Sequence, residues 1–290
     1  MLLLLAAFLP CLIWDGSPEE PAKLGIERIC RPDQVDANAM QKLVAPGVQY
    51  RENEATSSRS PWLDANGWRF VRNPKNRFLY EVKGREAELA VVETFAYSAD
   101  TVMRTDAAGM AAYGQITAFL KNVPAADLPI RANIGVVEDG SAEAGELMNL
   151  LARHNLLYRV VNAPDAHLDV NVKIGTNDYP NKEAADASLM SHKVRSQLGD
   201  ERRLMRIYGS EVVVGRLLGD QGRARIHLIN YSKNSIEGLR VRVKGSYARN
   251  QLYMSGAPAA KLEDYEVVEG STEFTIATMN RYAVIDLFAR

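Results

Sequence analysis

Residues 134–141 read Ile-Gly-Val-Val-Glu-Asp-Gly-Ser and form the clearest strand-to-helix junction in the chain. Four apolar residues, three of them β-branched, predict a buried strand over 134–137. The strand ends at Glu-Asp-Gly, and Ser141 is a typical N-cap for a helix over 142–153. A buried strand followed directly by a helix is the repeating unit of a parallel sheet, so this stretch predicts an α/β fold.

The same alternation extends on both sides, from residue 11 to about 215. Predicted strands are 11–14, 26–30, 48–50, 101–104, 157–161, 168–174 and 204–208, and predicted helices are 33–43, 84–99, 107–120 and 182–198. About eight strand–helix units fit, which predicts a compact or degenerate (β/α)-barrel. The alternative is two smaller open sheets, the second flavodoxin-like and beginning at Ile134. Both arrangements place functional groups at the carboxyl ends of strands.

The pattern changes at about residue 215, where helical periodicity stops. Short strand-like runs follow at 223–229, 238–243, 251–254, 265–268, 273–276 and 282–287. Residues 240–244, Arg-Val-Arg-Val-Lys, alternate strictly, as a half-exposed antiparallel strand does. We therefore expect an α/β domain over 15–215 and a small antiparallel β-sandwich over 216–290.

Residues 1–14, MLLLLAAFLPCLIW, are almost wholly apolar. The run is too short for a membrane span, which needs about 20 residues. One interpretation is the hydrophobic part of a secretory leader, although no Lys or Arg precedes it. The other is a leader remnant over 1–8 followed by the first buried strand at 11–14. We expect a secreted or periplasmic protein.

Composition excludes several function classes. The 35 Lys and Arg residues are balanced by 36 Asp and Glu, so no basic excess exists to bind a nucleic-acid backbone. The two cysteines form no C-x-x-C, the four histidines are scattered without H-E-x-x-H, and we expect no metal and no cofactor. The chain has no G-x-G-x-x-G, no G-K-[ST] and no G-x-S-x-G, which argues against a nucleotide-binding loop and an α/β-hydrolase.

Carboxylates follow several predicted strands: Asp15, Asp106, and the pair Glu138 and Asp139. Hydrolysis of a glycosidic bond needs two carboxyl groups, one a proton donor with a raised pKa and one ionised. Because parallel strands end at a common edge, these acids could provide such a pair. The alternative is that each acid caps the helix that follows it.

Residues 62–69, Trp-Leu-Asp-Ala-Asn-Gly-Trp-Arg, are the densest cluster of ligand-type groups. Two tryptophans flank Asp64 and Asn66, and indole rings stack on the apolar faces of sugars while Asp and Asn bind hydroxyls. The alternative is a hairpin with a structural turn at Asn66 and Gly67. Glu93, beside the apolar stripe of its helix, is either a functional acid or half of an ion pair with a residue such as Arg104.

The order of the parts resembles multidomain glycoside hydrolases of the β-galactosidase type. The resemblance rests on an α/β region that contains 134–139 and a β region that ends in 282–287, Tyr-Ala-Val-Ile-Asp-Leu, and covers mainly 130–290. In that family a (β/α)-barrel precedes an amidotransferase-like α/β domain and a small β domain. No Cys occurs beyond Cys30, so amidotransferase activity is not expected. Because 290 residues are too few for all three domains, the barrel here is either abbreviated or absent.

We therefore expect a glycoside hydrolase for a small β-linked sugar, and the resemblance implies a β-galactoside. The carboxylates expected to act are Asp15, Asp64, Glu93, Asp106 and Glu138, and the expected substrate contacts are Trp14, Asn66, Trp68, Arg104 and Asp139. The alternative is a non-catalytic secreted module for carbohydrate binding or assembly. A third hypothesis is an esterase that uses Ser141 or Ser210. A homo-oligomer is compatible with each.

Overall fold

The computed structural model describes residues 8–49 and 61–289, and the chain folds into two compact units, 1–127 and 128–290. The predicted domain boundary at 215/216 lies inside the second unit and stays a prediction. Most of the predicted leader, residues 1–7, lies outside the described residues. Among the helices that the structure describes, none has the length and apolar character that crossing a bilayer requires.

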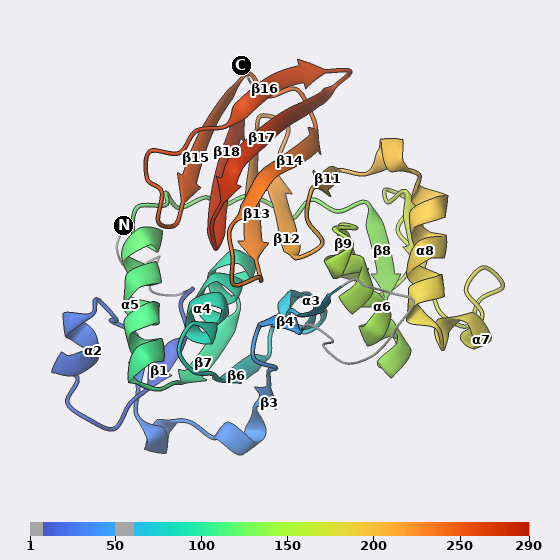
Figure 1. The fold of residues 1–290 in the computed structure, drawn as a ribbon. Coiled ribbons are helices and arrows are strands. Elements are labelled where there is room, and N and C mark those ends of the chain that lie inside the picture. Colours follow the sequence, from blue (N-terminus) through green and yellow to red (C-terminus); the bar gives the residue numbers. More distant parts are fainter. Residues whose placement is uncertain (1–7, 50–60, 290) are drawn as a thin grey trace. The chain divides into compact units, whose positions relative to one another are not determined.

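The first unit is built on five parallel strands in the order β2-β1-β7-β6-β3 (Figure 1). The strands are β1 (Cys11–Ile13), β2 (Ile29–Cys30), β3 (Gln41–Lys42), β6 (Arg77–Glu81) and β7 (Asp100–Arg104). Around a barrel, neighbouring strands follow one another along the chain and the last strand pairs with the first. The order here has that form, because β1 lies beside β2, β6 lies between β3 and β7, and the last strand, β7, pairs with the first, β1. Within the described residues the end strands β2 and β3 do not pair. The predicted α/β fold is confirmed, but in the described residues the predicted compact or degenerate barrel is not closed, and the parallel strands form two smaller open sheets.

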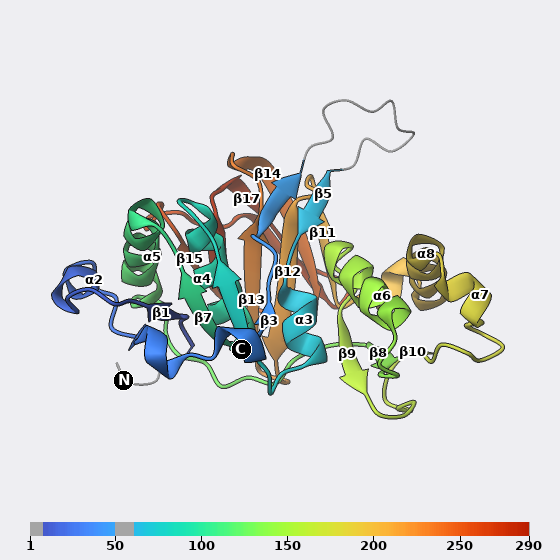
Figure 2. The same ribbon diagram turned by 90° about the horizontal axis from the view of Figure 1, so that it is seen from below.

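One face of this sheet is covered by helices α4 (Glu86–Tyr97) and α5 (Ala107–Leu120), which pack against each other (Figure 2). The buried side chains of Leu12, Phe78 and Met103 belong to this face. Thr94 of α4 and Thr101 of β7 join the layers through their hydroxyl oxygens, 2.9 Å apart. Both helices begin and end within three residues of the predicted ranges, because their apolar spacing is regular.

The opposite face is covered by the chain between β2 and β3, which forms the short 3-10 helices η1 (Pro32–Gln34) and η2 (Ala37–Ala39). Val35 packs there against Cys11, Leu79 and Val102. The helix predicted over 33–43 is wrong. The Asp36 side chain accepts hydrogen bonds from the backbone of residues 38 and 39, which starts a separate turn in the middle of that range.

A disulfide between Cys11 and Cys30 ties β1 to β2 on this second face. The remaining elements of the unit are α2 (Glu19–Lys23), the antiparallel pair β4 (Gly47–Gln49) and β5 (Trp62–Asp64), and α3 (Gly67–Arg72). The hairpin turn predicted at Asn66 and Gly67 is wrong, because these residues open α3. A Cβ at Gly67 would lie 2.2 Å from the Tyr97 ring, so a larger residue there would displace that ring.

The second unit begins with three parallel strands in the order β10-β8-β9. Its elements are β8 (Ile134–Val137), α6 (Ala142–Arg153), β9 (Tyr158–Val161), β10 (Val170–Val172), α7 (Asn181–Ala184), α8 (Ala187–Leu198) and η3 (Asp200–Arg202). The prediction around 134–153 is confirmed, and the Ser141 hydroxyl accepts a hydrogen bond from the Ala144 amide at 3.1 Å. The helix predicted over 182–198 is two helices, because Asp186 caps a new one.

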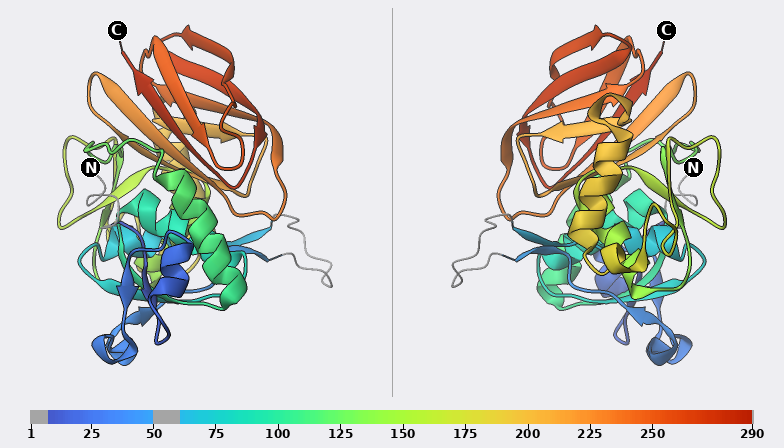
Figure 3. Two further views of the ribbon diagram at one scale, coloured as in Figure 1. Left: turned by 90° about the vertical axis from the view of Figure 1, so that its left-hand side faces the viewer. Right: turned by 90° about the vertical axis from the view of Figure 1, so that its right-hand side faces the viewer.

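Two antiparallel four-stranded sheets occupy 205–288, the region of the predicted sandwich (Figure 3). Their orders are β11-β14-β17-β16 and β12-β13-β18-β15, with β11 (Met205–Tyr208), β12 (Val213–Gly219), β13 (Arg223–Asn230), β14 (Ile236–Lys244), β15 (Arg249–Met254), β16 (Glu263–Val268), β17 (Ser271–Met279) and β18 (Tyr282–Phe288). Ile226, Val241 and Ile285 share one core between them. The predicted alternation in 240–244 is confirmed, since Val241 is buried while Arg240 is exposed.

Candidate functional site

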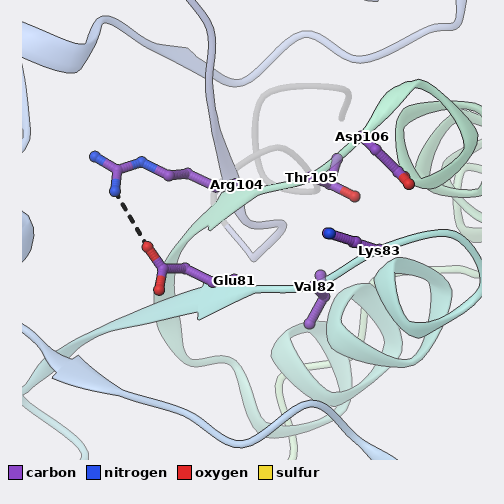
Figure 4. Close-up of a pocket in the computed structure, with 6 residues that line it drawn as sticks. All are labelled: Glu81, Val82, Lys83, Arg104, Thr105 and Asp106. Carbon is purple, nitrogen blue, oxygen red and sulfur yellow. Dashed lines mark hydrogen bonds and ion pairs between the residues drawn. The ribbon is translucent and has the colours of Figure 1, made fainter.

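A pocket of about 310 Å³ opens at the carboxyl ends of β6 and β7 (Figure 4). It is lined by Glu81, Val82, Lys83, Arg104, Thr105 and Asp106. The carboxyl edge of a parallel sheet is where ligands bind in barrels and open α/β folds, because strands end there and variable loops begin. This is the strongest candidate site in the first unit.

Glu81 is held between two cations that come from neighbouring strands. Lys42 on β3 and Arg104 on β7 lie 3.0 Å and 3.1 Å from its two carboxylate oxygens. The hydrogen bond from Lys42 lowers the pKa of Glu81 from its ordinary value of 4.5; burial opposes it, and the charge of Lys42 and the contact with Arg104 lower the pKa further. Glu81 is therefore ionised at neutral pH and suits a role as an anionic group, not as a proton donor.

Asp106, the second pocket carboxylate, caps α5. Its Oδ1 accepts hydrogen bonds from the amides of Gly109 at 2.7 Å and Gly84 at 2.9 Å. These bonds lower the pKa of Asp106 below its ordinary value of 3.8. Figure 4 shows Asp106 turned toward the start of α5, while Glu81 and Arg104 extend together in another direction. The geometry fits the helix-capping alternative.

Glu93, a predicted catalytic acid, is buried on α4 and does not line the pocket. It accepts hydrogen bonds from the Asn66 backbone at 2.7 Å, the Asn66 side chain at 3.1 Å and the Tyr80 hydroxyl at 2.6 Å. Burial, followed by the charge of Glu93, raises the pKa of Tyr80 well above its ordinary value. The ion pair predicted between Glu93 and Arg104 is replaced by the pair of Arg104 with Glu81. Asn66, also buried, joins α3 to α4.

Asp64 and Trp68 make separate contacts elsewhere in the same unit. Asp64 accepts hydrogen bonds from the Trp62 indole at 3.2 Å and the Gln49 amide at 2.5 Å, all on the β4–β5 pair. Trp68, half-buried on α3, is covered by the guanidinium of Arg69, 4.3 Å from the ring centre. None of these residues lines the pocket.

Trp14 and Asp15 follow β1, which pairs with β7, so they lie at the same carboxyl edge as the pocket. The Trp14 indole donates a hydrogen bond to the Ser17 carbonyl at 2.9 Å, and its ring lies against Gly16. Trp14 thus folds over its own loop. Asp15 is exposed, and neither residue lines the pocket.

Glu138 and Asp139 lie at the carboxyl end of β8, in the second unit. Glu138 accepts a hydrogen bond from the Gly140 amide at 2.7 Å, and Asp139 accepts from the Ser141 amide at 2.9 Å and the Ser141 hydroxyl at 2.6 Å. Both carboxylates therefore stabilise the loop that leads into α6. The hydroxyl of Ser210 accepts from the Val212 amide at 3.2 Å, also a local turn contact.

Glu81 and the two lysines near it, Lys42 and Lys83, were not among the residues predicted from the sequence. A signal for Glu81 existed, because residues 78–81, Phe-Leu-Tyr-Glu, are an apolar strand that ends in a carboxylate, as 11–15 is. No local signal marks Lys42, which approaches Glu81 only through the pairing of β3 with β6. In residues 8–49 and 61–289, no three His, Cys, Asp or Glu side chains are grouped in a way that could hold a metal ion.

No family model matches the chain, and no curated protein matches its sequence. Among solved structures, alpha-L-fucosidase isoenzyme 2 from Paenibacillus thiaminolyticus is similar, with a TM-score of 0.55 and 9% identity over 77% of this chain and 62% of that chain. Beta-galactosidases from Bacillus circulans sp. alkalophilus and Rahnella sp. R3 align with TM-scores of 0.39 and 0.38, at 9% and 10% identity, over 86% of this chain and 55% of each of theirs.

The solved structures named above are glycoside hydrolases, and the fold shared with the fucosidase agrees with a resemblance to that class at the level of architecture. This chain spans less than two thirds of the length of each. At 9% identity the fucosidase shows a shared fold and nothing about activity. The beta-galactosidase TM-scores are too low to carry an argument.

Proposed function

We propose that the chain is a glycoside hydrolase that binds its sugar in the pocket at the ends of β6 and β7, with Glu81 as the ionised carboxylate. The observation that carries this proposal is the position of Glu81 between Lys42 and Arg104 at the carboxyl edge of the sheet. Glycosidic cleavage develops positive charge on the sugar ring, and a nearby carboxylate stabilises it or attacks it.

The fold shared with an alpha-L-fucosidase makes an α-L-fucoside one sugar to test. The resemblance to the β-galactosidase type makes a β-galactoside the other sugar to test. Neither pocket carboxylate has a raised pKa, so the proton donor must come from elsewhere on the same edge. Asp15 follows β1, which pairs with β7, so it lies at that edge but outside the pocket lining, and we propose it as the donor.

A second candidate is a non-catalytic carbohydrate-binding module. The observation that favours it is that Glu81 and Asp106, the two carboxylates that line the pocket, are both held ionised. Such a pocket binds hydroxyl groups but contains no acid that would protonate a leaving group.

Release of nitrophenol from aryl glycosides distinguishes the two candidates. The panel includes a β-galactoside and an α-L-fucoside, and compares the unmodified chain with Glu81→Gln, Asp15→Asn and the exposed control Glu20→Gln. We expect turnover that both test variants lose and the control keeps. Binding of a sugar without turnover of any glycoside would favour the second candidate, and absence of both would contradict each.

We also propose that the protein is secreted or periplasmic. The Cys11–Cys30 disulfide supports this, because such bonds persist mainly in oxidising compartments. Fractionation of cells that express the full chain checks it. Recovery in the cytosol with both thiols free would contradict the proposal.

A further inference from the structure

Residues 31–40, which join β2 to β3, form a strap across the face of the first sheet opposite α4 and α5. In the part of the chain that the structure describes, the hydrogen bonds of the strap stay within it. Asp36 accepts from the amides of residues 38 and 39, and the Arg31 amide donates to the Gln34 side chain. The strap is therefore held to the sheet by apolar contacts and by its two ends.

The first end of the strap is attached by the disulfide. Cys30, the last residue of β2, is bonded to Cys11 on β1. β2 has two residues and pairs only with β1, so the covalent bond is the firmest attachment of this end. Next along the strap, Val35 packs against Cys11, Leu79 and Val102. The sulfur of Cys11 thus belongs to the same apolar cluster that the strap covers.

The other end of the strap leads directly to the pocket. β3 follows it, pairs with β6 at two residues and carries Lys42, whose ammonium lies 3.0 Å from the Glu81 carboxylate. Beyond β3 the chain is fixed again, because the Asn66 side chain donates to the Val44 carbonyl at 3.0 Å. Between Cys30 and Val44, the position of Lys42 therefore depends on the strap lying against the sheet.

We propose that the Cys11–Cys30 bond is a redox switch for the pocket. Its formation holds the strap on the sheet and so places Lys42 against Glu81, and in the reduced chain the strap loosens and Lys42 withdraws. Two thiols and a disulfide oxidant R–S–S–R give the Cys11–Cys30 bond and two R–SH by thiol–disulfide exchange. Cys30, which is half-buried, exchanges first, and Cys11 then displaces the second R–SH. This order matches the proposed secretion, since a chain meets such oxidants after it leaves the cytosol.

The inference rests on the proposed function because it concerns the regulation of the same pocket, but its test needs no substrate. The hydrogen bond from Lys42 is the largest cause of the lowered pKa of Glu81. Withdrawal of Lys42 should therefore raise the pKa of Glu81 toward its ordinary value of 4.5. A Glu81 that does not respond to reduction overturns the switch, whereas the proposed function stands or falls on turnover.

The test compares the oxidised full chain with the chain reduced by dithiothreitol. Cys11 and Cys30 are the only cysteines in the sequence, so the reductant has a single disulfide to act on. Hydrogen exchange followed by mass spectrometry should show residues 31–43 exchanging on the order of tenfold faster after reduction, with α5 unchanged. Titration followed by the ¹³C shift of the Glu81 carboxyl should show its pKa rising.

Two variants separate the switch from other effects of the reductant. In Lys42→Met the pKa of Glu81 should already be raised and should not respond to reduction. In Cys11→Ser with Cys30→Ser, the reductant should change neither exchange nor the pKa. An unchanged pKa of Glu81 in the reduced chain, equal exchange of residues 31–43 in both states, or an equal response in Lys42→Met would each overturn the proposal.

Indole fluorescence shows whether the reduced chain stays folded. For a reduced chain that unfolds, Val35→Ala replaces reduction, because it weakens the strap while the disulfide is intact. The same rise in exchange of residues 31–43 and in the pKa of Glu81 is expected. A Val35→Ala variant that matches the unmodified chain in both measurements would overturn the coupling between the strap and the pocket.

Discussion

The two parallel sheets of this protein use strand-end carboxylates in different ways. At the edge of the first sheet, Glu81 is held by side chains from two neighbouring strands, Lys42 and Arg104. At the edge of the second, Glu138 and Asp139 accept hydrogen bonds from their own loop. A carboxylate that its own backbone satisfies stabilises a turn. A carboxylate that is held by cations on several strands has a fixed position relative to the whole sheet, as a ligand site requires.

The largest expected effect is on activity. Glu81→Gln should lower kcat/KM for an aryl glycoside by on the order of 10²–10⁴-fold, the range for loss of a participating acid or base. Glu138→Gln should change it less than about twofold, because that carboxylate holds a loop. Circular dichroism of both variants controls for folding. Loss of activity in Glu138→Gln with Glu81→Gln intact would reverse the comparison.

The next effect is on the stability of the first unit. Removal of the 19-residue crosslink by Cys11→Ser with Cys30→Ser should cost about 3 kcal/mol. All three tryptophans lie in residues 1–127, so indole fluorescence in urea reports this unit alone. A fluorescence midpoint that is the same with and without the disulfide would contradict the expectation.

A smaller effect tests the role of Glu93. Glu93→Gln places an amide where three donors converge, and should cost about 1–3 kcal/mol of unfolding free energy. Glu20→Gln, exposed on α2, should change stability by less than about 0.5 kcal/mol. If Glu93→Gln unfolded at the unmodified midpoint yet lost turnover, Glu93 would be the functional acid that its sequence position first suggested.

The N-cap at each sheet edge should contribute about 1 kcal/mol to the stability of its own unit. Asp106→Ala should destabilise the first unit by this amount and Ser141→Ala the second, through loss of an N-cap. Asp106→Ser restores a cap without a carboxylate, and should recover both stability and turnover. A stable Asp106→Ser variant without turnover would instead indicate that the Asp106 carboxylate takes part in the reaction.

The smallest expected effect is on the pH profile. The pKa of Glu81 in the folded chain is below its ordinary value of 4.5. Its negative charge is therefore kept at pH values where an ordinary Glu begins to be protonated, and is lost as the pH falls through the lowered pKa. The acid limb of activity should therefore lie below pH 4.5. Lys42→Met removes the main cause and should move the limb upward. An acid limb at the same pH in Lys42→Met would show that ionisation of Glu81 does not control the rate.

Local patterns predicted some of the regular elements, but not β3 or β6. The apolar strand at 134–137 and the Ser141 cap specify their structure within a few residues, as does the spacing that makes α5. The helix predicted over 33–43 failed because Asp36 competes for the backbone amides. The compact or degenerate barrel was a less reliable prediction for a long-range reason: local patterns did not mark β3 or β6 as strands, and β2 and β3 do not pair in the described residues.

The site was predictable only in part. Arg104 and Asp106 follow a recognisable strand, and both line the pocket. Lys42 reaches Glu81 through strand pairing between residues 39 apart, which no local pattern encodes. Glu93 and Asn66 are of the residue types expected in a sugar site, but both are buried and the Asn66 side chain donates a hydrogen bond to Glu93.

Amide chemical shifts of the ¹⁵N-labelled full chain during titration with galactose and with L-fucose test the location of the site most directly. We expect shifts to concentrate at residues 81–84 and 104–109, with 138–142 unchanged. Shifts confined to 138–142 would place the ligand at the second sheet, and would contradict the assignment of Glu81 as the carboxylate that faces the sugar.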